Sequence, residues 1–432
     1  MTGVAPRPGN YHDGMGASVS LDVGGQQVSV TNPDKVVFPD FNGRPSVTKL
    51  DLINYYLAVA DGALRGVANR PMILKRFVKG ITEEAVFQKR APEKRPGYID
   101  VAELKYASGT SAKEAVIHDA AGLAWAINMG CVDLNPHPVQ AEDLAHPDEL
   151  RVDLDPMPGV DWKQIVEVAL VAREVLEDHG LTAWPKTSGS RGFHIYARIQ
   201  PRWPFKFVRL AAQTVAREVE RRAPELATAR WWKEEREGVF VDFNQNAFDR
   251  TVASAYSVRA LPDARVSTPL RWDEVAECRP EAFTIATVPA RFAEIGDPWE
   301  SMDSASGVLD PLLDLADRLG PAEKAPKGAK GSSGGARRRI SKMPLIEIAR
   351  TKTKDEAMAA LDEWRGRYPS VAEKLQPADI LVDGMRGPSS IWYRIRINLQ
   401  HVPQDQRPPQ EPLLADYNPW ENYSGPQWMR GG

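Results

Sequence analysis

The chain has few cysteines and no surplus of charge of either sign. Its two cysteines, Cys131 and Cys278, lie far apart among 432 residues, and no Cys-x-x-Cys pair is present. This argues against a disulfide framework and against a cysteine-rich zinc module. The 55 Lys and Arg nearly balance the 58 Asp and Glu. Any nucleic-acid-binding surface must therefore be a local patch and not a global basic charge.

Long apolar segments are also missing. The most apolar stretch, around residues 120–132, is shorter than the roughly 20 residues that a membrane-spanning helix needs. The first twenty residues are polar and glycine-rich, without the apolar segment of a signal peptide. We therefore expect a soluble cytoplasmic (nucleoid-associated) protein with no membrane partner and a flexible N-terminus over residues 1–27.

The order of the expected elements indicates an α/β (α+β) fold for residues 28–310. Helical periodicity is found over residues 163–179 and 207–222, and strand patterns over 150–155, 193–199 and 239–243. Strands that alternate with helices are typical of such a core. A chain of this length is expected to form more than one domain.

The composition changes at Pro321. Residues 321–343 are basic and rich in Gly, Ser and Pro, which predicts a flexible linker. Its arginines at 337–339 could contact a nucleic-acid backbone or serve only to keep a tether soluble. Residues 344–432 form a C-terminal extension of unknown role, with a helix expected at 354–368 and a strand at 390–399. We expect the aromatic, proline-rich tail after residue 403 to fold back on its own domain, although docking to a partner is an alternative.

The candidate catalytic residues begin with Asp153 and Asp155, one residue apart in the strand expected at 150–155. Side chains alternate along a strand, so the two carboxylates share one face. Like charges this close are unfavourable unless a cation lies between them, and oxygen ligands select hard ions such as Mg²⁺ or Mn²⁺. A pair of such ions about 3.5–4 Å apart promotes in-line displacement at phosphorus. The alternative is an ordinary solvated strand edge.

A turn rich in glycine and serine, residues 186–196, follows one helix later and leads into the next strand. Glycines allow backbone N–H groups to approach phosphate oxygens. Arg191 adds charge and His194 could donate to a triphosphate. Each feature alone is commonly structural, but together, one helix after the acidic strand, they predict a triphosphate site.

A third segment, residues 239–246, places Asp242 and Asn244 on one face of an expected strand. Asp242 could supply a further carboxylate to the ion nearest an attacking hydroxyl. Downstream, Arg259 offers a cation for charge on a phosphoryl group.

These three segments resemble the signature motifs of the archaeo-eukaryotic primase superfamily. The similarity is greatest to the polymerase domain of the bacterial end-joining enzyme DNA ligase D and its stand-alone actinobacterial relatives. It extends over residues 32–272 and includes Asp242 with Gln245 and Asn246. Shorter matches precede the motifs in the same order, at residues 32–39, 70–71, 87–90 and 121–125. The resemblance implies a primase–polymerase catalytic core with an RRM-like sheet and an N-terminal α/β module.

The resemblance also implies roles for individual residues. Asp153 and Asp155 would bind both metal ions, Mn²⁺ or Mg²⁺, and Asp242 the ion at the primer 3′-hydroxyl. The residues that would hold the incoming nucleoside triphosphate are Ser188, Ser190, Arg191, His194, Gln245 and Arg259. Those that would bind DNA are Lys35 and Lys49 at a 5′-phosphate, Phe87 stacked on the template, and Lys75, Arg76 and Lys89 along the DNA track. Without the resemblance, Phe87 reads as a core residue and the lysines as surface residues.

Two departures from the family pattern stand out. Where Glu-Leu-His-Pro is expected, this chain has Asp133-Leu134-Asn135-Pro136-His137. Either Asn135 replaces a histidine near the nucleotide sugar or His137 supplies one from a shifted backbone. No ligase motif is recognisable, so sealing is expected from a partner such as a DNA ligase or an end-joining factor.

The sequence therefore predicts a template-dependent DNA-repair polymerase that adds one or a few nucleotides, with a leaning toward ribonucleotides, at gapped or broken DNA with a 5′-phosphate. One alternative is a non-catalytic module that binds DNA ends or gaps and recruits repair partners. A two-metal nuclease is another, because the same carboxylates can activate water, but it leaves the triphosphate site without a purpose.

Overall fold

The structure is a computed structural model that describes residues 18–106, 109–321, 343–386, 391–419 and 421. The chain divides into two compact units. The first holds residues up to 155, 162–229 and 239–320, and the second holds residues 156–161, 230–238 and those from 321 on. The expected linker, residues 321–343, falls almost entirely outside the described residues, as do residues 1–17.

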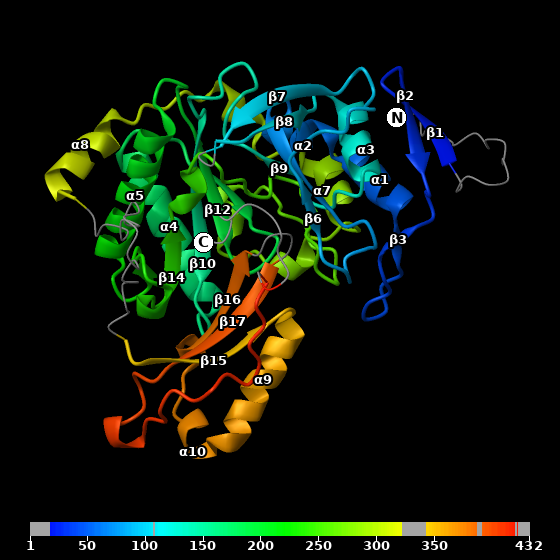
Figure 1. Cartoon of the computed structure of the whole chain (residues 1–432). Coiled ribbons are helices and arrows are strands. Elements are labelled where there is room, and N and C mark those ends of the chain that lie inside the picture. Colours follow the sequence, from blue (N-terminus) through cyan, green and yellow to red (C-terminus); the bar gives the residue numbers. More distant parts are fainter. Residues whose placement is uncertain (1–17, 107–108, 322–342, 387–390, 420, 422–432) are drawn as a thin grey trace. The chain divides into compact units, whose positions relative to one another are not determined.

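A five-stranded sheet in the first unit carries the expected acidic motifs (Figure 1). Its strand order is β11 (Trp184–Thr187), β12 (Phe193–Arg198), β10 (Glu149–Pro156), β14 (Val239–Asp242) and β13 (Ala227–Thr228). The helices α4 (Trp162–Asp178) and α5 (Phe205–Arg222) pack against these strands and against each other. The strands expected at 150–155, 193–199 and 239–243 and both expected helices are present, with ends shifted by at most two residues. The mixed α/β prediction is confirmed.

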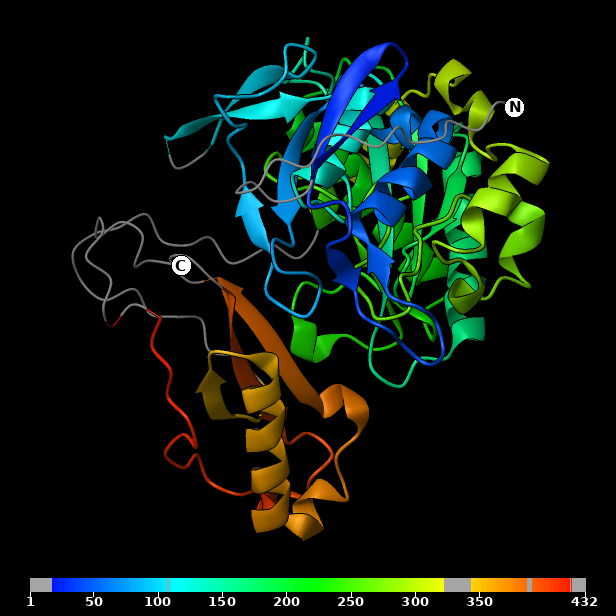
Figure 2. The same cartoon turned by 90° about the vertical axis from the view of Figure 1, so that its right-hand side faces the viewer.

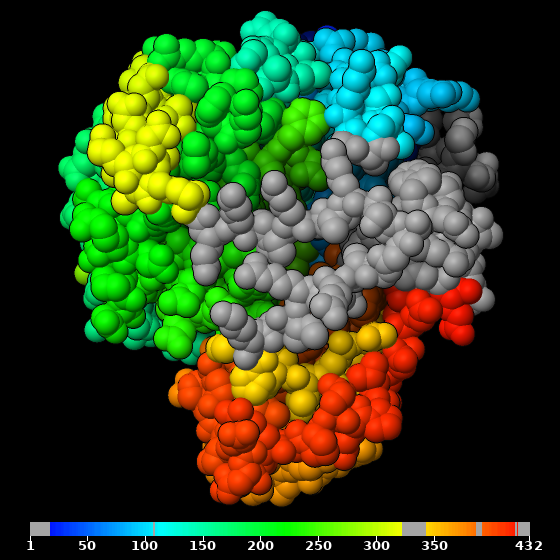
Figure 3. Space-filling view, turned by 60° about the vertical axis from the view of Figure 1, so that its left-hand side comes forward, coloured from blue at the N-terminus to red at the C-terminus, as the bar shows by residue number. Residues whose placement is uncertain are grey.

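The two faces of β10 differ as the alternation predicts. Leu150, Val152 and Leu154 are fully buried, and apolar burial of this kind is the main force that fixes a strand against its helices. Asp153 and Asp155 lie on the other face. On the outside of α5, α8 (Asp310–Leu319) adds a further helix, which Figure 3 shows in yellow on the surface.

A second sheet with its own helices forms the N-terminal part of the first unit. It contains β6 (Val86–Gln88), β5 (Pro71–Arg76), β8 (Ser111–Val116) and β7 (Asp100–Lys105), and β9 (Asn135–Pro136) pairs with β5. Helices α1 (Lys49–Ala58), α2 (Ala60–Val67) and α3 (Ala120–Asn128) pack together beside it. Thr48 and Asp51 form a capping box at the start of α1, which satisfies the free N–H groups there.

Smaller elements complete the first unit. They are the short strands β3 (Val36–Phe38) and β4 (Val47–Thr48) and the helices α6 (Trp272–Val275) and α7 (Val288–Ile295). Residues 18–27, which we expected within the flexible N-terminus, belong instead to an antiparallel hairpin of β1 (Ser18–Val23) and β2 (Gln26–Thr31). The hairpin forms because Val23, Val28 and Val30 alternate with polar residues and are buried.

The second unit is a three-stranded antiparallel sheet covered by a helix. Its strand order is β15 (Leu345–Thr351), β17 (Ile391–Asn398) and β16 (Ile380–Arg386). Helix α9 (Lys354–Arg367), followed by the short α10 (Pro369–Ala372), lies across one face (Figure 2). The helix and strand expected from the sequence in this region are both present.

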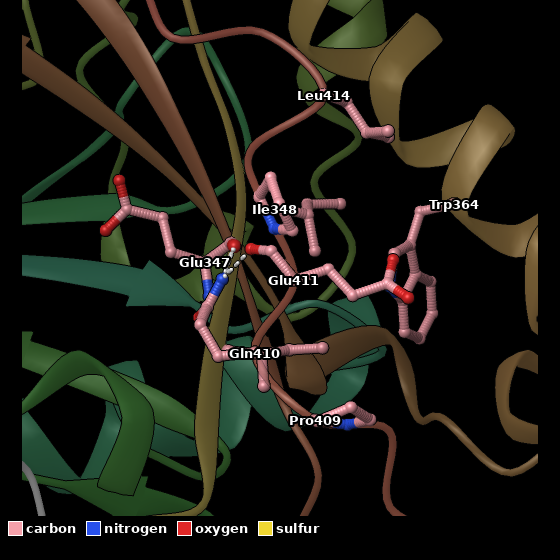
Figure 4. Close-up of a pocket in the computed structure, with 9 residues that line it drawn as sticks. Glu347, Ile348, Trp364, Pro409, Gln410, Glu411 and Leu414 are labelled. Carbon is pink, nitrogen blue, oxygen red and sulfur yellow. Dashed lines mark hydrogen bonds between the residues drawn. The ribbon is translucent and has the colours of Figure 1, made fainter.

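The described part of the C-terminal tail packs on this second unit. Leu414 and Tyr417 donate backbone hydrogen bonds to the carbonyls of Ile348 and Arg350 on the edge of β15. Figure 4 shows the seam between β15, Trp364 and residues 409–414. Its cavity of about 10 Å³ has room for about one water molecule. The tail therefore folds back as expected, up to Tyr417. Most of the expected aromatic end lies outside the described residues.

No helix among the described residues is long and apolar enough to cross a bilayer.

Candidate active site

Three aspartates from two neighbouring strands lie together. Asp153 and Asp155 come from β10, and Asp242 ends the adjacent β14. One carboxylate oxygen from each residue lies within 4.8 Å of the others. Asp153 is buried, Asp242 is half-buried and Asp155 is exposed, so the cluster opens toward solvent on one side.

Neighbouring amides hold these carboxylates in place. The Gln245 amide donates to Asp153 (3.3 Å) and to Asp242 (3.1 Å) and so bridges the two strands. The backbone N–H and the side-chain amide of Asn244 both donate to Asp242, at 2.8 and 2.9 Å. Asn244 lies in a 3₁₀ turn, residues Asn244–Asn246, and not on the strand that we expected to reach it.

The electrostatics of the cluster favour a cation. Burial raises the pKa of Asp153 to about 6, although Lys186 and Arg259 act in the opposite direction. A positive charge beside a buried carboxyl group stabilises its ionised form. The donor set is entirely oxygen, which fits Mg²⁺ or Mn²⁺ better than a softer metal.

A cavity of about 320 Å³ lies directly beside the aspartates. Its wall contains all six residues that the sequence analysis assigned to the nucleotide: Ser188, Ser190, Arg191, His194, Gln245 and Arg259. Asp153 and Asp155 also line it, and Phe87 from β6 does too, with half of its surface exposed. The structure thus gathers the expected triphosphate residues and acids from four separate segments.

The serine-rich turn is built differently from the expectation. Gly189 has φ +67°, and a Cβ there would lie 2.6 Å from Arg259 and 2.8 Å from the backbone of Ser267, so glycine is required. The N–H groups of Ser190 and Gly192 both donate to the Ser188 hydroxyl at 3.1 Å. These two N–H groups close the turn and do not point as free donors toward a phosphate.

Several residues beside the cavity escaped the sequence analysis. Lys186 is fully buried behind His194. Burial lowers the pKa of Lys186, as does Arg259, while Asp153 raises it. Thr251, Val252 and Ala253 complete the cavity wall. Only the register of β11 with β12, which pairs Lys186 with His194, would have indicated Lys186. The 251–253 segment carries no pattern that would have indicated it.

Two of the three cations expected along one DNA track, Lys75 and Arg76, face different pockets. Lys75 points into the cavity and forms a 2.9 Å ion pair with buried Asp133. Arg76, the next residue of β5, contacts the carbonyl of Met129 in a different pocket. Lys89 lies 3.5 Å above the ring of Tyr106. Neighbours on a strand point to opposite faces, which explains the separation of Lys75 from Arg76.

A second pocket, of about 180 Å³, contains Lys35, Lys49 and Arg76. Burial lowers the pKa of Lys49, and the nearby Lys35 and Arg76 lower it further. Among the described residues no ion pair is found between Lys35 or Lys49 and an acidic side chain. Both bind backbone carbonyls instead, of Val78 and Thr31. This concentration of positive charge suits an anion.

The structure distinguishes the two alternatives for the Asn135 motif. Asn135 lines the large cavity. His137 is fully buried, and its Nε2 lies 2.9 Å from Glu114. His137 therefore does not reach the cavity. The residue of this motif that borders the cavity is Asn135.

Known proteins resemble this chain in sequence. The model of the LigD primase-polymerase domain matches residues 48–299, more than half of the chain. The multifunctional non-homologous end joining DNA repair protein LigD of Mycobacterium tuberculosis (strain CDC 1551) is 33% identical over 83% of this chain and 45% of its own length. The LigD of Mycolicibacterium smegmatis is 31% identical over 66% of this chain and 37% of its own length. The chain therefore spans less than half of these relatives.

A solved structure is similar as well. The polymerase domain of Mycobacterium tuberculosis Ligase D in complex with DNA is matched over 65% of this chain and 99% of that domain, with a TM-score of 0.60 and 31% identity. The sheet, the clustered aspartates and the adjacent cavity define a primase–polymerase of the archaeo-eukaryotic superfamily. Within that class, the chain belongs to the LigD primase-polymerase domain family.

Proposed function

We propose that this chain is a template-dependent DNA-repair polymerase that adds one or a few nucleotides, preferably ribonucleotides, at short gaps or broken ends. The observation that carries the proposal is the position of the three aspartates in and beside the cavity that holds the six expected triphosphate residues. A nuclease would need the acids but not the cavity. The names of the relatives, which include end joining, support a role in that repair process.

In the proposed reaction, Asp153 and Asp155 would hold two divalent ions and Asp242 the ion nearest the primer. Such ions supply charge neutralisation for the attack of a 3′-hydroxyl on the α-phosphate and for the departure of pyrophosphate. His194, Ser188 and Arg259 would orient the triphosphate, and the Gln245 amide would keep the carboxylates in register.

DNA would approach through both pockets. Phe87 is exposed beside the cavity and would stack on a template base. The pocket with Lys35, Lys49 and Arg76 would take the 5′-phosphate at the far side of a gap. The solved relative, a complex with DNA, agrees with this use of the fold.

The test is extension of a primer across a short gap that carries a 5′-phosphate, with Mn²⁺ or Mg²⁺ and each nucleoside triphosphate in turn. We expect extension by wild-type protein, faster with ribonucleotides, and none by the double variant Asp153→Ala/Asp155→Ala. Binding of the gap without extension under either metal would favour a non-catalytic recruiting module. Shortening of the primer would favour a nuclease.

A further inference from the structure

A buried cation stands directly behind the histidine of the cavity. Lys186, on β11, is the register partner of His194 on β12 and is fully buried. Its ammonium nitrogen lies 2.7 Å from His194 Nδ1, 2.9 Å from the Ala253 carbonyl and 2.6 Å from the Ser267 hydroxyl. That hydroxyl donates its own hydrogen to the carbonyl of Thr187 at 2.7 Å. An ammonium group has three N–H donors and no acceptor, which matches the Ala253 carbonyl, the Ser267 hydroxyl and an Nδ1 that carries no hydrogen.

The other nitrogen of His194 faces the acids. Its Nε2 lies 3.3 Å from an oxygen of Asp153. Because one ring nitrogen faces the N–H donors of Lys186 and the other faces a carboxylate, the ring is neutral and carries one N–H. Which nitrogen carries it is set by the partners of the two nitrogens. A donor at Nδ1 and an acceptor at Nε2 both place the hydrogen on Nε2.

We propose that Lys186 is a positioning residue that holds His194 in the Nε2–H tautomer, so that the ring presents a donor to the phosphate oxygens of an incoming nucleotide. This inference rests on the proposed function, in which His194 holds the triphosphate. The opposite tautomer would direct a lone pair at anionic oxygens and repel them. An unprotonated Lys186 would have only two N–H groups for three partners, and Nδ1 would then become the donor.

The kinetic test replaces Lys186 with a side chain of similar length and no donor. For Lys186→Met we expect the KM for the nucleotide to rise roughly tenfold to a hundredfold, as for loss of a hydrogen bond to a charged group. The kcat should change by only a few-fold, because the same contact exists in the ground and transition states. In His194→Gln, adding Lys186→Met should raise the KM no further, since Lys186 acts only through His194. Additive losses would overturn the inference.

The direct test reads the tautomer itself. Full-length protein labelled with ¹⁵N-histidine, without metal or nucleotide, is examined by long-range ¹H–¹⁵N correlation, and His194 is assigned by the signals that His194→Gln removes. We expect the Nε2–H pattern in the wild type and a shift toward Nδ1–H in Lys186→Met. Thr187→Val is the matched control, because Thr187 is a buried neighbour on β11 whose hydroxyl bonds to Val266 and Thr268 and not to His194; it should leave the pattern unchanged.

An Nδ1–H pattern in the wild type, or an unchanged tautomer in Lys186→Met, would overturn the inference. The wild-type spectrum alone can do so, whether or not the variant folds. Because this readout needs no catalysis, it also separates failure of the inference from failure of the proposed function.

Discussion

The two units of the chain bury different kinds of side chain. In the first unit, Arg70, Glu149, Arg151, Lys186 and His194 are almost inaccessible to solvent. In the second unit, the core consists of aliphatic residues and one tryptophan: Ile346, Ile348, Leu361, Trp364, Ile395 and Ile397. Its polar exceptions are few among the described residues, and Asp379, bound to His401 at 2.8 Å, is one of them.

Buried charged side chains in the first unit are held by ion pairs close to the candidate active site. Burying charged groups is costly unless each has a partner. In the first unit, Glu149 contacts Arg70, Arg151 and Arg198 at 3.2, 2.8 and 2.9 Å. Burial opposes ionisation of Glu149, but these arginines outweigh it and lower its pKa to about 2. Glu149 and Arg151 belong to β10, so this network stabilises the strand that carries two of the three clustered aspartates. The second unit has a smaller network, in which Asp383 pairs with Arg394 and Arg396 at 3.1 and 2.9 Å.

The largest expected effect comes from Asp242→Asn, which keeps the shape of the side chain and removes its charge. Extension of a gapped primer should fall by on the order of 10³-fold or more, because the acid nearest the primer hydroxyl is lost. Nucleotide binding, measured by fluorescence titration, should change little, since Asp153 and Asp155 remain. Equal losses in binding and in extension would contradict the separate role of Asp242.

The next effect concerns stability. Arg70→Met removes the most buried partner of Asp148 and one of the three arginines that contact Glu149, and loss of one member of a buried pair costs about 3–5 kcal/mol. The matched control in the second unit is Arg365→Met. Arg365 forms an exposed ion pair with Asp362 at 3.2 Å, and exposed pairs are worth about 0–1 kcal/mol. Chemical denaturation should show this contrast. Similar costs for the two variants would remove the distinction between the units.

Metal binding should depend on pH. The pKa of Asp153 is raised to about 6, first by burial, so a proton competes with the cation below that pH. The affinity for Mn²⁺ should fall by about tenfold per pH unit below about pH 6 and level off above about pH 7. Titration calorimetry across this range measures it. An affinity that stays constant down to about pH 5 would show that Asp153 is not a ligand.

The smallest effect is expected in the second pocket. Lys49→Met removes one of three clustered cations and should weaken binding of gapped DNA several-fold, with a smaller dependence on salt. The comparison is the same gap without its 5′-phosphate, for which wild type and variant should bind alike. A loss that is the same for both substrates would place the phosphate elsewhere.

The sequence was sufficient wherever the relevant pattern is local. The alternation in residues 150–155, the periodicity before Gly180 and the glycine turn at Gly189 each predict an element that the structure contains. In the second unit, the helix expected at 354–368 is α9, which begins at a capping box formed by Thr353 and Glu356.

Long-range contacts were readable only through the resemblance, or not at all. That Asp242 would meet Asp153 depends on the order of strands in the sheet, which no local pattern specifies. The role of Lys186 depends on a register between strands, and the contact of His137 with Glu114 on a pairing of distant segments. Lys75 and Arg76 were assigned to one track, although the alternation of a strand separates them.

The most direct test of the central claim is electron paramagnetic resonance of Mn²⁺ bound to the full chain with a non-hydrolysable nucleotide. The account predicts two magnetically coupled Mn²⁺ ions per chain in the wild type, and loss of the coupled signal in Asp153→Asn/Asp155→Asn. Absence of coupled ions in the wild type, or a coupled signal that survives in the double variant, would contradict it.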